Sequence, residues 1–103
     1  MTKTAFVCTV EHINHVGIAV RDIEATLSFY GRIFGAGTEE IESLEDQGIR
    51  AALVRVGGSQ LEFIQPIDPD NSVARFIGRR GEGLHHLCFE VEDLGAKLKL
   101  LDE

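Results

Sequence analysis

The chain has 103 residues, and its 10 Lys and Arg against 17 Asp and Glu give a formal net charge of −7. This length favours a single domain, and the acidic balance argues against a nucleic-acid-binding protein, which normally carries a basic face. No apolar run approaches the ~18 residues of a membrane span, and the first residues lack the apolar region of a secretory signal. Cys8 and Cys88 each lie in an apolar stretch, which favours two buried free thiols over a disulfide. We therefore expect a cytoplasmic domain.

The first predicted element is a strand over residues 13–20, where apolar side chains alternate with small or polar ones. One face of this strand is apolar and carries Val16, Ile18 and Val20. The opposite face is small or polar and carries His15, Gly17 and Ala19.

A helix is predicted directly after this strand, with Asp22 as its N-cap. Its apolar side chains recur at spacings of four and three and form one stripe: Ile23, Leu27, Tyr30 and Phe34. Gly35 is expected to end the helix.

Three strands are predicted next, near 37–44, at 49–56 and at 60–66, with a tight turn at 57–59. A short helix capped by Ser72 or Asn71 is expected to run through Ile77.

The end of the chain is expected to hold a loop at 78–83, a strand at 84–91 and a last helix capped by Asp93. On both strands 60–66 and 84–91, alternation separates an apolar face from a face with polar side chains. Strand and helix patterns mixed in this order predict an α+β fold.

An internal repeat is visible when the sequence is shifted by 71 residues, which carries His15 onto His86 and Asp22 onto Asp93. The repeated unit is β-α-β-β-β, and we expect module one at about 13–66, a linking helix at about 70–79 and part of module two at about 83–103. The second unit stops after its helix. We therefore expect either a chain that is incomplete at its C-terminal end or a second copy that supplies the missing strands.

Three polar side chains fall on the non-apolar faces of three strands: His15, Glu62 and His86. If the sheet is concave, they converge, and two imidazoles with one carboxylate are a common ligand set for Zn²⁺, Co²⁺, Mn²⁺ or Fe²⁺. The alternative is that each side chain is solvated or satisfied locally. His12 and His85 are weaker candidates because strict alternation points them to the other side.

The segments INHVGIAVRDIEATLSFY, LEFIQP and NSVARFIGRRGEGLHHLCFEVEDL resemble the methylmalonyl-CoA epimerases. This family belongs to the vicinal oxygen chelate superfamily, together with glyoxalase I, extradiol dioxygenases and bleomycin-resistance proteins. The resemblance runs from about residue 13 to the end of the chain, and GEGLHH is its most specific part. It implies paired β-α-β-β-β modules that form a cupped sheet around a divalent metal such as Co, Mn, Zn or Ni.

Carried over residue by residue, the resemblance implies that His15, Glu62 and His86 are the metal ligands. The fourth family ligand, a Glu on the last strand that also serves as the expected proton carrier, has no counterpart before Glu103. Some family members carry a second proton-transfer carboxylate after a QG turn, and that place is occupied here by Ala51. The catalytic proton-transfer residues therefore stay unknown.

The resemblance implies epimerisation of 2-methylmalonyl-CoA, by removal and return of a proton through a metal-stabilised enolate. A glyoxalase I-like lyase and a non-catalytic small-molecule-binding protein of the same fold are the alternatives.

An acyl-CoA substrate is anionic, so this acidic chain would need a local cationic site. Arg75, Arg79 and Arg80 cluster around the predicted short helix and could supply it, although they could also form a solvated edge. Gln47, in the QG turn, is a further candidate for substrate contact. Paired modules and an unfinished cup predict a homodimer.

Overall fold

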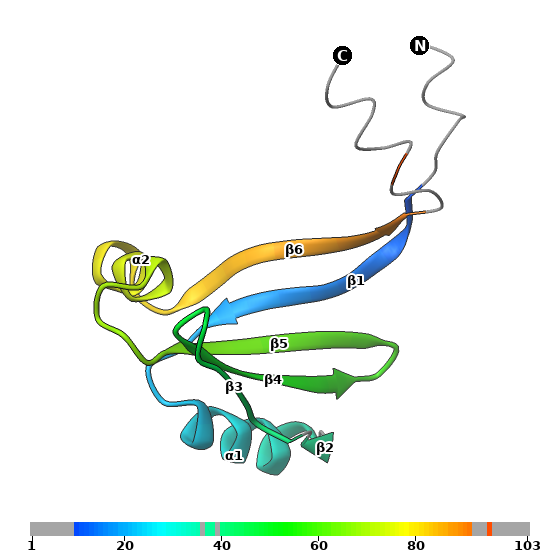
Figure 1. Cartoon of the computed structure of the whole chain (residues 1–103). Coiled ribbons are helices and arrows are strands. Elements are labelled where there is room, and N and C mark those ends of the chain that lie inside the picture. The colour runs from blue at the N-terminus through cyan, green and yellow to red at the C-terminus, as the bar shows by residue number, and fades with distance from the viewer. Residues whose placement is uncertain (1–9, 36, 39, 92–94, 96–103) are drawn as a thin grey trace.

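The computed structural model of the chain describes residues 10–35, 37–38, 40–91 and 95 (Figure 1). Its elements in chain order are β1 (Val10–Ala19), α1 (Ile23–Phe34), β2 (Gly37–Thr38), β3 (Glu42–Leu44), β4 (Ile49–Val56), β5 (Ser59–Pro66), α2 (Ser72–Arg80) and β6 (Gly83–Val91).

The strands form one sheet in the order β2-β4-β5-β1-β6, with β3 paired to β4 beside this path. β1 lies parallel to β5 and antiparallel to β6, so the two halves of the chain meet along β1 and β6. Helix α1 packs below β4 and β5 in the view of Figure 1, and α2 connects the ends of β5 and β6. The α+β prediction is confirmed, with one complete β-α-β-β-β unit.

Two apolar clusters cover the two faces of this sheet. On the α1 face, the buried side chains are Val20, Ile23, Leu27, Ala52, Val54 and Phe63. On the α2 face, they are Ala19, Ile49, Ala51, Ile64, Val73 and Ile77. Neighbours along β1 and β5 thus enter different clusters, as the alternation predicts. Glu62 has the same parity as Ile64, which directs it to the α2 face.

Local capping agrees with the predicted helix starts. The Asp22 carboxylate accepts a hydrogen bond from the Ala25 N–H at 3.0 Å. Of the two candidate caps for α2, Asn71 performs this role, because its side-chain oxygen accepts from the Val73 N–H at 2.6 Å.

The β4–β5 hairpin turns at Gly57, whose φ of 60° suits the first central position of a type II′ turn.

Two predicted boundaries were wrong. The strand expected near 37–44 is split into β2 and β3, which pair with different parts of β4. Such short edge segments limit unwanted pairing with other chains. Helix α2 runs to Arg80 rather than Ile77, because Gly81 closes the last turn on the Ile77 carbonyl and two basic side chains suit the C-terminal end of the helix dipole.

The ladder between β1 and β6 is interrupted by register shifts. Between the pairs Ile13–Phe89 and His15–Cys88, β1 has one extra residue, and between Gly17–His86 and Ile18–Leu84, β6 has one extra residue. These are β-bulges, which bend a strand and re-aim its side chains.

The predicted last helix after Asp93 lies outside the described residues, except for Gly95. Among the helices that the structure describes, none has the length and apolar character that a bilayer span requires.

Candidate metal centre

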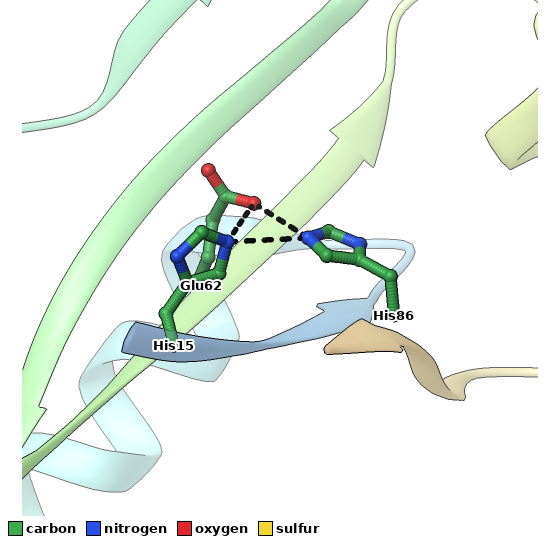
Figure 2. Close-up of side chains that lie close together, drawn as sticks. All are labelled: His15, Glu62 and His86. Carbon is green, nitrogen blue, oxygen red and sulfur yellow. Dashed lines mark hydrogen bonds and ion pairs between the residues drawn. The ribbon is translucent and has the colours of Figure 1, made fainter. Parts of the chain in front are cut away.

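The side chains of His15 on β1, Glu62 on β5 and His86 on β6 point toward one another (Figure 2). They line one hollow with Ser72 and Val73 of α2, so they meet on the α2 face of the sheet. The Glu62 Oε1 atom lies 3.5 Å from His15 Nε2 and 3.3 Å from His86 Nε2. The two Nε2 atoms are 3.3 Å apart. His15 and His86 are far apart in the sequence but lie close together because β1 and β6 are paired in the sheet. Glu62 lies on β5, which pairs with the other edge of β1.

The spacing of these three donor atoms fits one divalent ion. Two ligand atoms that each lie about 2.1 Å from an ion are about 3.0 Å apart in an octahedral arrangement and about 3.4 Å apart in a tetrahedral one. The observed separations lie close to these values. The side chains are 16%, 25% and 35% exposed for His15, Glu62 and His86, so the cluster is shielded but reachable. Two imidazoles and one carboxylate are the chemistry that Zn²⁺, Co²⁺ and Mn²⁺ accept.

Gly17 provides the space into which the His86 ring turns. The two residues are directly paired across β1 and β6. A Cβ atom at Gly17 would overlap with the His86 ring atoms. The glycine is thus the position at which the His86 side chain crosses closely over the neighbouring backbone.

Each imidazole has a second neighbour at its Nδ1 atom. His15 Nδ1 lies 2.9 Å from Asn14 Oδ1, and His86 Nδ1 lies 2.9 Å from His85 Nδ1. The expectation that His85 points away from His86 was wrong, because the β6 bulge breaks the alternation at this residue. Burial lowers the pKa of His85, the neighbouring His86 lowers it further, and Glu62 opposes both effects. The side chain of His12 lies outside the described part of the chain.

The cluster opens into a hollow of about 800 Å³. Gln47 lines this hollow, together with the three candidate ligands, His85 and Cys88. An adjoining hollow of about 350 Å³ shares Ser72 and His85 with it and is lined by Arg79 and Arg80.

The other sequence candidates lie less centrally. Arg75 lines neither hollow, and its guanidinium donates a hydrogen bond to the Asp70 carbonyl. Cys88 is a free thiol, as predicted, but half-buried rather than buried. Cys8 lies outside the described residues.

The family model of the Glyoxalase/Bleomycin resistance protein/Dioxygenase superfamily matches residues 14–103. The chain belongs to this superfamily. Its fold is therefore the vicinal oxygen chelate fold that the sequence resemblance implied.

Among members of the superfamily, the chain is similar to methylmalonyl-CoA epimerases. It is 34% identical over 94 residues to the mitochondrial methylmalonyl-CoA epimerase of Homo sapiens, covering 90% of this chain and 53% of that protein. The crystal structure of methylmalonyl-CoA epimerase from Mycobacterium tuberculosis superposes with a TM-score of 0.82 at 36% identity, over 90% of this chain and 63% of that one.

A Streptomyces coelicolor methylmalonyl-CoA epimerase in complex with 2-nitronate-propionyl-CoA has a TM-score of 0.82 at 31% identity, over 91% of this chain and 71% of that one. The chain spans about half the length of the mitochondrial relatives that it matches.

Two residues of the site were missed by the sequence reasoning. Asn14 was not considered, and His85 was expected on the opposite face. The available signal was the 71-residue repeat of this chain, since the shift that carries His15 onto His86 also carries Asn14 onto His85.

Replacement of Gly17 by alanine is expected to weaken Co²⁺ binding by about 10- to 100-fold, the range seen when the surroundings of a metal ligand are disturbed. The added methyl group would displace the His86 ring while the strand remains compatible with alanine. Isothermal titration calorimetry measures the affinity. Gly58→Ala is the matched control, because a Cβ atom there meets open space. Equal affinities of both variants and the wild type would contradict this role of Gly17.

Proposed function

We propose that this protein is a metal-dependent epimerase that interconverts the stereoisomers of 2-methylmalonyl-CoA. The observation that carries the proposal is the convergence of His15, Glu62 and His86 in one hollow. It is supported by the similarity to epimerases, one of them described as a complex with methylmalonyl-CoA and NH₄⁺. Because those proteins are longer than this chain, their activity and substrate enter here only as a proposal.

In this proposal, three side-chain atoms bind a divalent ion: His15 Nε2, Glu62 Oε1 and His86 Nε2. A bound divalent ion supplies Lewis-acid stabilisation of the negative charge that develops on the substrate when its α-proton leaves. Glu62 is assigned as a ligand rather than a base, because its Oε1 faces both imidazoles. Ala51 is buried in β4 and offers no proton-transfer group. The proton carrier is expected to be the last-strand Glu of the family.

The hollow also indicates how an acyl-CoA would be held. We propose that Gln47 contacts the acyl group beside the metal centre and that Arg79 and Arg80 bind the anionic part of coenzyme A. Arg75, which is exposed on α2, remains a further candidate for binding this anionic part of coenzyme A.

The variant Arg79→Ala/Arg80→Ala is expected to raise the KM for the CoA ester by about 10-fold or more, since a charge-assisted hydrogen bond contributes about 1.5–3 kcal/mol. The kcat should stay within about twofold, because neither side chain reaches the three candidate ligands. Steady-state kinetics separates the two constants. Arg32→Ala, in the last turn of α1 on the other face of the sheet, is the control. A fall in kcat at constant KM would contradict the assignment.

We propose further that residues 1–103 form one domain, with its first module at about 13–66, a linking helix at about 70–79 and part of the second module at about 83–103.

We also propose that the protein is a homodimer in the cytoplasm. The apolar side chains that β6 exposes at the edge of the sheet, Leu84, Leu87 and Phe89, support a partner surface. Sedimentation velocity and cell fractionation test these two statements, and a monomer or a non-cytoplasmic location would contradict them.

The test of the proposed function is exchange of the substrate α-proton with deuterated water, followed by proton NMR on the protein at its full length. With Co²⁺ bound, the account predicts exchange that is lost in His15→Ala and His86→Ala. A Co²⁺-loaded protein without exchange would reject the epimerase. Activity on a glutathione hemithioacetal, without activity on the CoA ester, would replace it with a glyoxalase I-like lyase.

A further inference from the structure

The environment of His15 fixes which of its ring nitrogens carries the proton. The Asn14 Nδ2 group donates to Glu90 Oε1 at 3.3 Å, and a carboxylate oxygen can only accept, so the amide is oriented with its Oδ1 atom toward the ring. This oxygen lies 2.9 Å from His15 Nδ1, which must therefore donate. A neutral imidazole with its proton on Nδ1 has a free lone pair on Nε2, the atom that faces Glu62.

His86 is held in a comparable way. Its Nδ1 atom lies 2.9 Å from His85 Nδ1, so one of the two rings donates to the other. When His86 Nε2 binds an ion, its single ring proton must be on Nδ1, and His85 is then the acceptor. The His85 ring is itself held edge-on against Phe76 of α2, with the ring centroids 4.9 Å apart.

Both neighbours owe their positions to the bulges between β1 and β6. Consecutive residues of a regular strand point to opposite faces, so neither Asn14 nor His85 could reach the ring that follows it. Asn14 is the extra residue of the bulge between Ile13 and His15, and His85 is the extra residue of the bulge opposite Gly17 and Ile18. The two positions are separated by 71 residues, as are His15 and His86.

We propose that Asn14 and His85 are paired positioning residues, which orient the two imidazoles and keep their Nε2 lone pairs available for a divalent ion. This inference rests on the proposed metal centre. Hydrogen-bond partners behind a metal-bound histidine fix the ring orientation and its tautomer. The repeat thus supplies two ligands and, at the residue before each ligand, the group that orients it.

The first test compares variants that keep or remove the acceptor atom, with Co²⁺ alone as the probe in calorimetric titrations. Asn14→Leu and His85→Phe preserve side-chain size but remove the acceptor, and each is expected to weaken Co²⁺ binding by about 10- to 100-fold. In His85→Asn the side-chain oxygen replaces the ring Nδ1, and this variant is expected to bind within about threefold of the wild type or more tightly.

The second test is long-range ¹H–¹⁵N correlation NMR of the metal-free wild type, at a pH at which the rings are neutral. We expect the His15 proton on Nδ1, and a shift of its population toward Nε2 in Asn14→Leu. A purely structural role of Asn14 would not move this signature. A wild-type His15 with its proton on Nε2 would overturn the proposal even if the variants fail to fold.

The outcomes separate this inference from the metal centre itself. If the wild type binds no Co²⁺, the metal centre is rejected and the inference falls with it. If the wild type binds Co²⁺ and both Asn14→Leu and His85→Phe bind it equally tightly, only the inference is rejected.

Discussion

Replacement of His86 by alanine is expected to lower the affinity of the chain for Co²⁺ by more than about 100-fold. Loss of a hydrogen-bond partner behind a ligand already costs 10- to 100-fold in metal affinity, and loss of a ligand removes a bond to the ion itself. The change leaves His15 and Glu62 as a two-donor pair, which holds a divalent ion poorly. Isothermal titration calorimetry or the visible absorption of Co²⁺ reports the affinity.

The matched control is Cys88→Ala. Cys88 pairs with His15 across β1 and β6 and lines the same hollow, but it is outside the group of three donor atoms. Its variant should bind Co²⁺ like the wild type. Because His86 is partly exposed, the free energy of unfolding of its alanine variant should lie within about 1 kcal/mol of that of the wild type. Loss of Co²⁺ binding in Cys88→Ala but not in His86→Ala would show that a different set of ligands is used.

Replacement of Phe63 by alanine is expected to lower the free energy of unfolding by about 3–5 kcal/mol. Phe63 has no exposed surface, and its ring packs against Tyr30 of α1 with the centroids 4.9 Å apart. The alanine variant would leave a cavity between β5 and α1 that the surrounding side chains cannot fill completely. Since a small domain has a total stability of about 5–15 kcal/mol, this single change would remove a large part of it. Urea denaturation followed by circular dichroism measures the change.

Phe34→Ala provides the comparison for this prediction. Phe34 also contacts Tyr30, with the centroids 5.4 Å apart, but it is 59% exposed at the end of α1. Its removal should cost about 1 kcal/mol or less. Equal losses for the two phenylalanines would contradict the assignment of Phe63 to the centre of the α1 cluster.

Alternation in the strands was sufficient to predict the two faces of the sheet. On β5, it separates Glu62 from Phe63, and the structure places Phe63 against α1 while Glu62 faces the imidazoles. The predicted meeting of His15, Glu62 and His86 is thus observed as a geometry, while their role as ligands stays a proposal. The repeat was informative because it relates positions on β1 and β6, which become neighbours in the sheet.

The bulges could not be predicted in the same way. A bulge adds one residue to one strand of a pair, so it depends on how two strands fit together rather than on the pattern within either. His85 was therefore placed on the wrong face, although the adjacent His86 was placed correctly. The end of α2 shows a related limit: the three residues after Ile77 are a glycine and two arginines, so no apolar side chain marks the last turn beyond Ile77, and only the hydrogen bond from the Gly81 N–H to the Ile77 carbonyl reveals that the helix continues.

X-ray absorption at the cobalt edge, on the chain loaded with one equivalent of Co²⁺, tests the metal centre most directly. The account predicts scattering from two imidazole rings, with the remaining ligands being oxygen atoms, at about 2.1 Å from the ion. A sulfur ligand at about 2.3 Å, or a spectrum with fewer than two imidazoles, would contradict it.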